Sequence, residues 1–279
     1  MPNSPKLTEK EILEALERSG YLFESEIAKE LYDYGFFIES NAVSLDPFTG
    51  KSREIDLVAE YYCTDERHNR RHENKAIART KFIFEIKNTS FPLVLMTKVE
   101  PSPNSEEWKG MKTYETSPEE DFILFQNFYH LLVSNNDETL YSQYCSFNKK
   151  KANEELMALH PENLYSGLSK ISCYCEEILE RFEGKHIKDE YWRNFFYLPV
   201  IIINDDLYES QIFKNERRKL KKVNCSRLIF SYHYKQKPKL AIIYVVTRKG
   251  LKEFLKHVLK AESVIEETLI QQAQKKTTP

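Results

Sequence analysis

Long apolar runs are absent from this chain, and their absence excludes one class of protein. No stretch approaches the roughly eighteen consecutive apolar residues that a membrane-spanning helix needs. The opening segment MPNSPKLTEKE is polar and lacks the apolar core of a secretory signal peptide. We therefore expect a cytoplasmic protein that does not span a membrane.

Cysteines are few and odd in number, which argues against a disulfide framework. The five of them are scattered at positions 63, 145, 173, 175 and 225. Such a distribution is typical of reduced thiols in a reducing compartment. It agrees with the expectation of a cytoplasmic protein.

The remaining composition predicts an α/β protein with one sizeable core. Hydrophobic residues make up 41% and aromatic residues 13% of the 279 residues. No internal repeat or linker divides the chain, so we expect a single elaborated domain over 1–279, with a central mixed β-sheet flanked by helices. Its core motif region covers 19–96 and is followed by a loop or insertion over 97–121. A helical region covers 149–183, and C-terminal strands with a helix cover 195–270.

The N-terminal part reads as two helices followed by a hairpin. Apolar residues recur every three to four positions over 10–34, Gly20 interrupts that pattern, and Thr8 with Glu11 has the spacing of a capping box. A strand is expected over 36–43, followed by a turn over 45–50.

Later segments give clearer strand and helix patterns. The stretch 122–133 is ambiguous between helix and strand. We expect strands over 91–96 and 195–203, a helix over 161–182, a hairpin of 228–234 with 240–246, and a closing helix over 251–270.

Three charged residues lie inside two of the apolar runs near the N-terminus. Asp56 lies in REIDLVAEYY, while Glu85 and Lys87 lie in KFIFEIKN. Successive strand residues point to opposite faces, so Glu85 and Lys87 share one face and Phe84 and Ile86 the other. Two carboxylates and an ammonium could thus hold a divalent cation and a water against a phosphodiester. The competing interpretation is an edge strand with surface ion pairs.

These residues resemble the PD-(D/E)xK nuclease superfamily, and within it an Mrr-like group. The resemblance rests on a G-x-x-F-E helix start at Gly20, Phe23 and Glu24, then on I-D-L-V around Asp56, and then on the E-x-K pattern that ends at Lys87. Position 55 is Ile rather than the Pro that names the superfamily, and the segment between the two strands is longer than a minimal hairpin. The resemblance implies a restriction-endonuclease-like fold.

The same resemblance implies a metal-dependent nuclease, most readily of DNA, in prokaryotic restriction or phage defence. Asp56, Glu85 and the carbonyl of Ile86 would ligate Mg²⁺ or Mn²⁺, with Glu24 completing the shell. Lys87 would hold the attacking water. Either Glu26 or Glu30 could replace Glu24 as the helix carboxylate.

Two further expectations concern partners and an inactive form. A homodimer, or a partner protein from a defence system, would suit a double-strand cutter. The alternative function is a catalytically inactive nuclease-like module that binds nucleic acid or a partner protein.

Affinity for nucleic acid would have to come from local basic segments. The chain has 41 Lys and Arg against 43 Asp and Glu, a formal charge of −2. Basic segments occupy 67–72, 149–151 and 214–222. The first lies between the two candidate strands, so Arg67, Arg70 and Arg71 are candidate contacts to phosphates beside the site. The alternative for such a charge run is a solvated loop.

Overall fold

The structure is a computed structural model that describes residues 7–45, 49–61, 64–99, 110–117, 139–149, 155–182, 191–212 and 218–277. The expected ambiguous segment 122–133 lies outside these residues. None of the helices described has the length and apolar character required to cross a bilayer.

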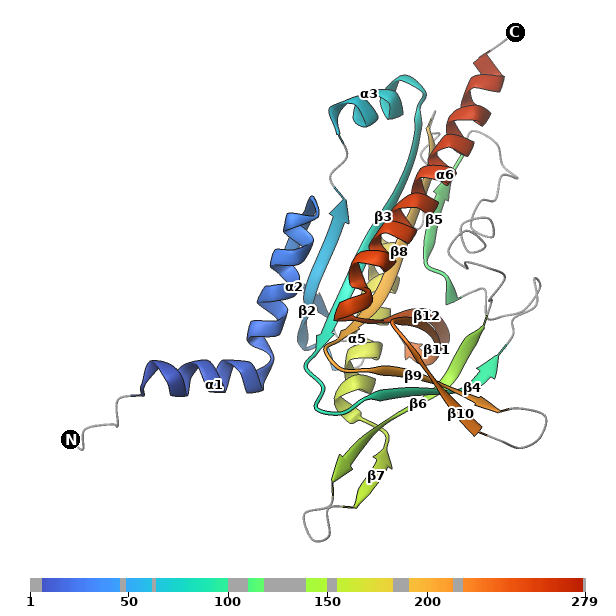
Figure 1. The fold of residues 1–279 in the computed structure, drawn as a ribbon. Coiled ribbons are helices and arrows are strands. Elements are labelled where there is room, and N and C mark those ends of the chain that lie inside the picture. The colour runs from blue at the N-terminus through green and yellow to red at the C-terminus, as the bar shows by residue number, and fades with distance from the viewer. Residues whose placement is uncertain are drawn as a thin grey trace.

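Two helices open the described chain, as the sequence predicts. Helix α1 spans Glu9–Ser19 and α2 spans Tyr21–Asp33. Thr8 and Glu11 form the expected capping box, with the Thr8 N–H donating to Glu11 Oε2 over 2.8 Å. Helix α1 buries no side chain and projects away from the body of the molecule (Figure 1), whereas α2 buries an apolar stripe against the sheet.

Twelve described strands form one mixed sheet. Its order is β1-β2-β3-β8-β12-β11-β6-β4-β9-β10, with β5 paired to β8 and β7 paired to β6. The strands are β1 (Phe36–Leu45), β2 (Ser52–Tyr61), β3 (Ala76–Lys87), β4 (Leu93–Val99), β5 (Thr113–Thr116), β6 (Leu140–Lys149), β7 (Leu156–Leu159), β8 (Trp192–Ile203), β9 (Leu207–Ile212), β10 (Arg218–Val223), β11 (Cys225–Tyr234) and β12 (Lys237–Thr247).

The centre of the sheet is parallel and its first edge is a hairpin. Strands β1 and β2, and β2 and β3, pair antiparallel, whereas β3 pairs parallel with β8 and β8 with β12. The C-terminal ends of β3, β8 and β12 therefore lie on one edge of the sheet. In α/β sheets ligands bind at such an edge.

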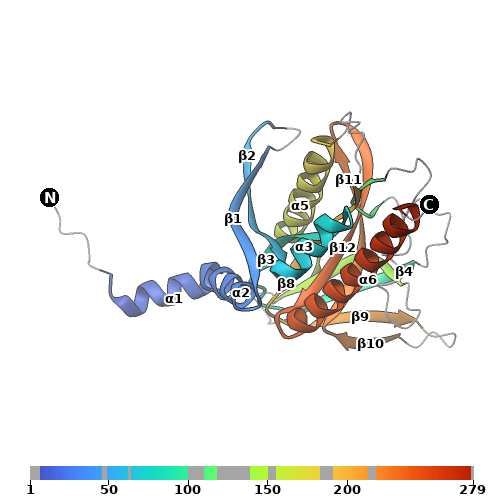
Figure 2. The ribbon, with the colours of Figure 1, turned by 90° about the horizontal axis from the view of Figure 1, so that it is seen from above.

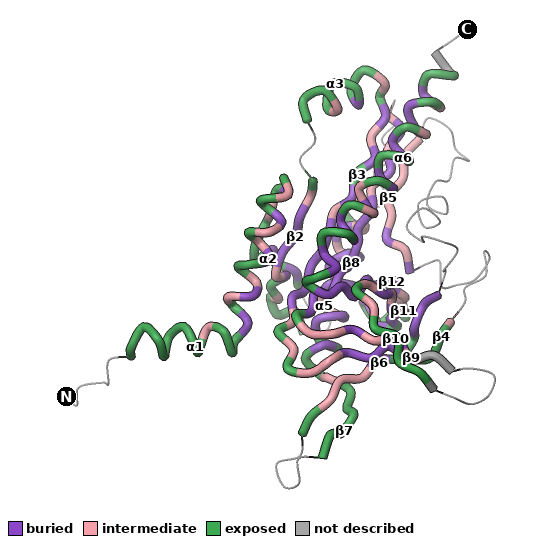
Figure 3. Tube along the Cα trace, viewed as in Figure 1, coloured by how far each residue is buried: buried purple, intermediate pink, exposed green. Residues whose placement is uncertain are grey.

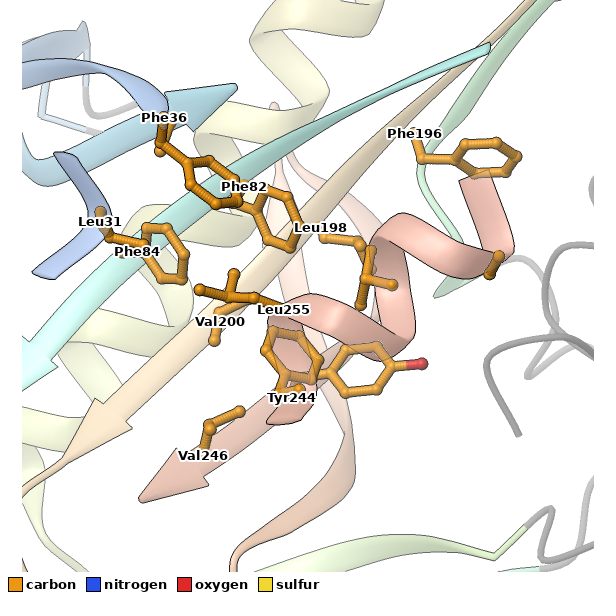
Figure 4. Packing of buried hydrophobic residues seen from close by; sticks show 14 of the residues in the cluster. Leu31, Phe36, Phe82, Phe84, Phe196, Leu198, Val200, Tyr244, Val246 and Leu255 are labelled. Carbon is orange, nitrogen blue, oxygen red and sulfur yellow. The ribbon is translucent and has the colours of Figure 1, made fainter. Parts of the chain in front are cut away.

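Helices cover both faces of this central part. Helix α5 (Glu162–Glu180) and helix α6 (Leu251–Thr277) lie on opposite sides of β3 and β8, as Figure 2 shows. Alternation along β3 separates two cores: Phe82, Phe84 and Ile86 pack with α2 and α6, whereas Ile83 packs with α5. Strands β3 and β8 are buried along most of their length (Figure 3), and Figure 4 shows Phe82 and Phe84 among the first group.

The coarse architecture agrees with the sequence: a large mixed sheet flanked by helices. The expected hairpin is β11–β12, and the expected helix near 161–182 is α5 with Pro161 as its N-cap. Two segments hold strands that the sequence did not predict. The segment 97–121, expected as a loop or insertion, contains the end of β4 and all of β5, and the region 149–183, expected as helical, contains strand β7.

Candidate active site

Asp56 and Glu85 meet where the ladder between β2 and β3 ends. The paired register runs from Glu60–Lys81 to Leu57–Phe84, and its next step would place Asp56 opposite Glu85. Here the Ile86 N–H donates 2.7 Å to Asp56 Oδ2, so a side chain takes the place of a ladder acceptor. Glu85 is only 2% exposed, although its strand ends just beyond it.

Lys170 of α5 bridges these two carboxylates. Its Nζ lies 3.0 Å from Asp56 Oδ1 and forms an ion pair with Glu85 Oε2. Burial lowers the pKa of Lys170, but the charges of Glu85 and Asp56 outweigh burial and set it above its usual value. The charged ammonium is therefore held between the partly buried Asp56 carboxylate and the buried Glu85 carboxylate. The sequence did not single out this residue.

Lys87 completes the arrangement from the end of β3. Its Nζ lies 2.5 Å from Glu85 Oε1, so Glu85 has an ammonium on each carboxylate oxygen. This confirms that Glu85 and Lys87 share a face, and Ile86 is buried on the other face with Phe84. At the site the Ile86 N–H donates to Asp56, and its carbonyl as a metal ligand stays a prediction.

Glu24 lies near this group without contacting it. Burial raises the pKa of Glu24, and the negative charges of Asp56 and Glu85 raise it further. Its two alternatives face elsewhere: Glu26 and Glu30 both pair with Arg248, in the 3₁₀ turn just before α6. Of the three helix carboxylates, Glu24 is thus the one on the side of the site.

Side-chain amides hold the loops around the end of β3. Asn88 donates 2.8 Å to the Glu17 carbonyl of α1, and Asn204, which follows β8, donates to Asn88 Oδ1. Gly20, at φ +90°, separates α1 from α2, and a Cβ there would stand 3.2 Å from the Asn88 Cβ. The G-x-x-F-E helix start is thereby anchored beside the E-x-K strand.

A cavity of about 670 Å³ opens beside Lys87, at the N-terminal end of α5. Asn88, Phe91, Phe147 and His160 are among its lining residues. Its volume lies within the range of ligand pockets. Polar and aromatic groups line it, and Lys87 is the site residue that reaches it.

The basic segment 67–72 does not lie beside this site, so that expectation of position was wrong. It belongs to helix α3 (Asp65–Glu73), at the opposite end of β3 from Glu85. Glu85 lies nine positions along the strand from Ala76, about 30 Å at the strand rise.

Arg67, Arg70 and Arg71 pair with glutamates of α6. Arg67 Nε lies 2.8 Å from Glu266 Oε1, and Arg70 lies against Glu267. Arg71 is buried, pairs with Glu266, and donates 2.7 Å to the Ala78 carbonyl. The charge run thus fastens α3 to α6, and its contact with nucleic acid stays untested.

The donor chemistry at the site fits a hard divalent cation. Mg²⁺ is commonly held by one or two carboxylates plus waters and substrate phosphates, and Asp56 and Glu85 supply two converging carboxylates. Within the described chain no group of three or more His, Cys, Asp or Glu side chains is placed to hold a metal ion. Lys170 Nζ stands between the two carboxylates, so a divalent cation bound by both would require the ammonium to move.

No protein-family model, curated protein or solved structure matches the chain.

Proposed function

We propose that this protein is a metal-dependent nuclease of the PD-(D/E)xK type that hydrolyses phosphodiester bonds, most readily of DNA. The observation that carries the proposal is the convergence of the Asp56 and Glu85 carboxylates on one point, where they share the Lys170 ammonium. Lys87 lies beside them. Burying two carboxylates at one point is costly unless cations compensate them. The proposal includes a restriction-endonuclease-like fold and a role in prokaryotic restriction or phage defence.

Each residue has a role in this proposal. A bound Mg²⁺ or Mn²⁺ would supply Lewis-acid activation of the phosphodiester. Asp56 and Glu85 would hold the cation, and the Ile86 N–H keeps the Asp56 carboxylate oriented. Lys87 would position the attacking water and offset the charge that builds on the phosphoryl oxygens. Glu24 would accept hydrogen bonds from water around the cation.

A cleavage assay tests the proposal directly. Purified protein is incubated with supercoiled plasmid, linear DNA or RNA, each with Mg²⁺, Mn²⁺ or EDTA. We expect metal-dependent cleavage that Asp56→Asn or Lys87→Ala reduces about 100-fold or more. Glu60→Gln and Lys81→Ala are matched controls, because Glu60 and Lys81 lie on the same two strands. Their ion pair, with 3.0 Å between Lys81 Nζ and Glu60 Oε1, lies away from the site. Cleavage by both site variants at the wild-type rate would refute the assignment.

The second candidate is a nuclease-like module without catalysis that binds nucleic acid or a partner protein. The observation in its favour is Lys170, which compensates both carboxylates without a metal. The two candidates differ in their thermal stability with metal. A metal ion that binds the folded protein raises its Tm once the metal concentration exceeds the Kd. If the site holds metal, this rise in Tm should vanish in Asp56→Asn. No shift in the wild-type protein would favour the inactive module.

A further inference from the structure

A large basic cleft lies on the face of the sheet opposite α5. It has a volume of about 1020 Å³ and is bounded by β10, the start of β11 and the first half of α6. Figures 1 and 2 show β9 and β10 beside the N-terminal end of α6. The cleft is separate from the carboxylate site, because α5 and α6 cover opposite faces.

The charge of this cleft is positive, in contrast to the chain as a whole. Its described lining includes four lysines, one arginine and one histidine against two glutamates, whereas the chain has a formal charge of −2. Two of the lysines, Lys221 and Lys222, come from the basic segment 214–222 that the sequence singled out. Such a local concentration of cations favours an anionic ligand.

The four lysines of the cleft are only partly compensated. Lys222 lies 2.5 Å from Asp206, while Lys221 reaches Glu209 only at 4.0 Å. On the opposite wall, Lys256 and Lys260 are exposed, and neither forms an ion pair within the described chain. They are one helical turn apart, so both ammonium groups project from the same face of α6.

The form of the cleft favours a polymer of phosphates over a small molecule. Small-molecule sites are mostly apolar, with a few polar groups, and bury most of the ligand. Here the two walls carry lysines, and Lys256 and Lys260 stand in a row about 6 Å apart along the helix axis. Phosphates spaced along a backbone match such rows, as they do in grooves that bind nucleic acid without reading its sequence.

The position of the cleft relates it to the candidate active site. Strands β3, β8 and β12 run parallel, so Lys87 and Thr247 end at the same edge of the sheet. Two strand spacings, about 10 Å, separate β3 from β12. The cleft lies at the β12 end of this edge, where Cys225 of β11 pairs with Val246.

We propose that this cleft binds the phosphodiester backbone of a single-stranded nucleic acid, without sequence preference. The inference rests on the proposed nuclease function, because the strand it holds would be the substrate that crosses the sheet edge to the carboxylate site. Lys221 and Lys222 contact phosphates from one wall, and Lys256 and Lys260 from the other.

Binding in EDTA tests the cleft without cleavage. The anisotropy of a fluorescent single-stranded 20-nucleotide DNA is measured at several salt concentrations for the wild type and for the double variant Lys256→Ala/Lys260→Ala. We expect binding at least tenfold weaker at low salt. The slope of log K against log salt should fall in magnitude by about 1.4, since each lost phosphate contact to a single strand contributes about 0.7.

A second double variant, Lys10→Ala/Lys29→Ala, removes the same charge from exposed helix positions outside the cleft. It should bind within about twofold of the wild type. Equal weakening in both variants, or no weakening in Lys256→Ala/Lys260→Ala, would overturn the proposal. So would tripolyphosphate binding as tightly as the oligonucleotide, because the ligand would then be a small anion. The Tm of each variant in the same buffer shows that it remains folded.

The outcomes separate this inference from the proposed function. Asp56→Asn should reduce metal-dependent cleavage, whereas Lys256→Ala/Lys260→Ala should weaken binding in EDTA. Binding through the cleft, with no cleavage under any metal, would refute the nuclease and leave a single-strand-binding surface. Metal-dependent cleavage with unchanged binding by the cleft variant would refute the cleft and leave the nuclease.

Discussion

Gly167 of α5 lies directly against Glu85 of β3. A Cβ at position 167 would stand 2.9 Å from both Cγ and Oε1 of Glu85, closer than side chains pack. Because Lys170 follows one helical turn later, the same close approach brings its ammonium to Glu85 and Asp56. The absence of a side chain at 167 therefore sets the distance between α5 and the carboxylates.

We predict that Gly167→Ala damages the site more than the fold. Overpacking costs about 1–3 kcal/mol, while alanine in place of glycine within a helix returns about 1 kcal/mol. The free energy of unfolding should thus fall by no more than about 2 kcal/mol, but Glu85 must move. Displacement on the scale of 1 Å should reduce metal-dependent cleavage about 100-fold. Ser166→Ala, at the neighbouring exposed position, is the control and should leave cleavage unchanged.

Lys170→Met should make the folded protein depend on metal. The variant keeps a similar length but leaves Asp56 and Glu85 without their shared ammonium. Glu85 keeps Lys87 and Asp56 keeps the Ile86 N–H, so the loss should stay below the about 3–5 kcal/mol of a fully unpaired buried charge. Thermal unfolding in EDTA should show this loss. Mg²⁺ or Mn²⁺ should then raise the Tm more than in the wild type, because no ammonium has to be displaced.

The control for this variant is Lys81→Met, which removes a more exposed lysine from its pair with Glu60. It should cost about 1 kcal/mol or less and leave the metal response as in the wild type. If metal fails to restore any stability to Lys170→Met, the two carboxylates are a structural ion-pair site.

The arginines of α3 provide a comparison of buried and exposed ion pairs. Arg71 is 3% exposed and pairs with Glu266, whereas Arg70 and Glu267 are about half exposed. Arg71→Met should lower the free energy of unfolding by more than Arg70→Met and by up to about 3–5 kcal/mol, because Glu266 keeps only Arg67 as a partner. Arg70→Met should cost at most about 1 kcal/mol. Chemical denaturation of both variants checks this, and similar values for the two would contradict it.

The elements that the sequence predicted are those whose apolar residues form a regular pattern or a continuous run. Strand β8 was recognised from its continuous apolar run, and the β11–β12 hairpin from two β-type runs around a short polar turn. Strand β10, with the sequence RKLKKV, has no such pattern, because an edge strand tolerates lysines on both faces. The strand is recognised only from its antiparallel pairing with β9.

Helix α3 has no apolar period for a related reason. Its nine residues include no aliphatic or aromatic hydrophobic side chain, since it is held by ion pairs to α6 rather than by an apolar stripe. Local cues were present: Thr64 accepts from the Arg67 N–H as an N-cap, and acidic residues occupy the first turn. The partner glutamates lie nearly two hundred residues away and could not be paired from the sequence.

The candidate site shows the same limit. Asp56, Glu85 and Lys87 could be found because charges inside β-type runs need a reason. Lys170 could not, because a lysine in an amphipathic helix is ordinary until the packing of α5 on β3 is known. The glycine three residues earlier was the one local sign of a close approach.

A last prediction concerns Glu176, a buried carboxylate of α5 far from the helix's site end. Burial pushes the pKa of Glu176 upward, but the Lys112 ammonium and hydrogen bonds from Lys112, Tyr232 and Lys239 outweigh it and hold the pKa below its usual value. The Tyr232 hydroxyl donates 2.7 Å to Oε1, and Lys239 lies 3.0 Å from Oε2. The ionised form is therefore the one that the fold stabilises.

The pKa of Glu176 is lower in the folded protein than its unfolded value of about 4.5. The ionised carboxylate therefore contributes fully to the free energy of unfolding above that pH, and this contribution is lost as the pH falls through the folded pKa. Glu176→Gln should lower the free energy of unfolding at pH 7 and flatten its decline below about pH 4.5. Denaturation curves from pH 7 to pH 3 measure both effects. Removing the ionisable group must remove its effect on the pH dependence of unfolding. If the free energy of unfolding of Glu176→Gln falls with pH as steeply as that of the wild type, the lysines and the tyrosine do not stabilise the carboxylate.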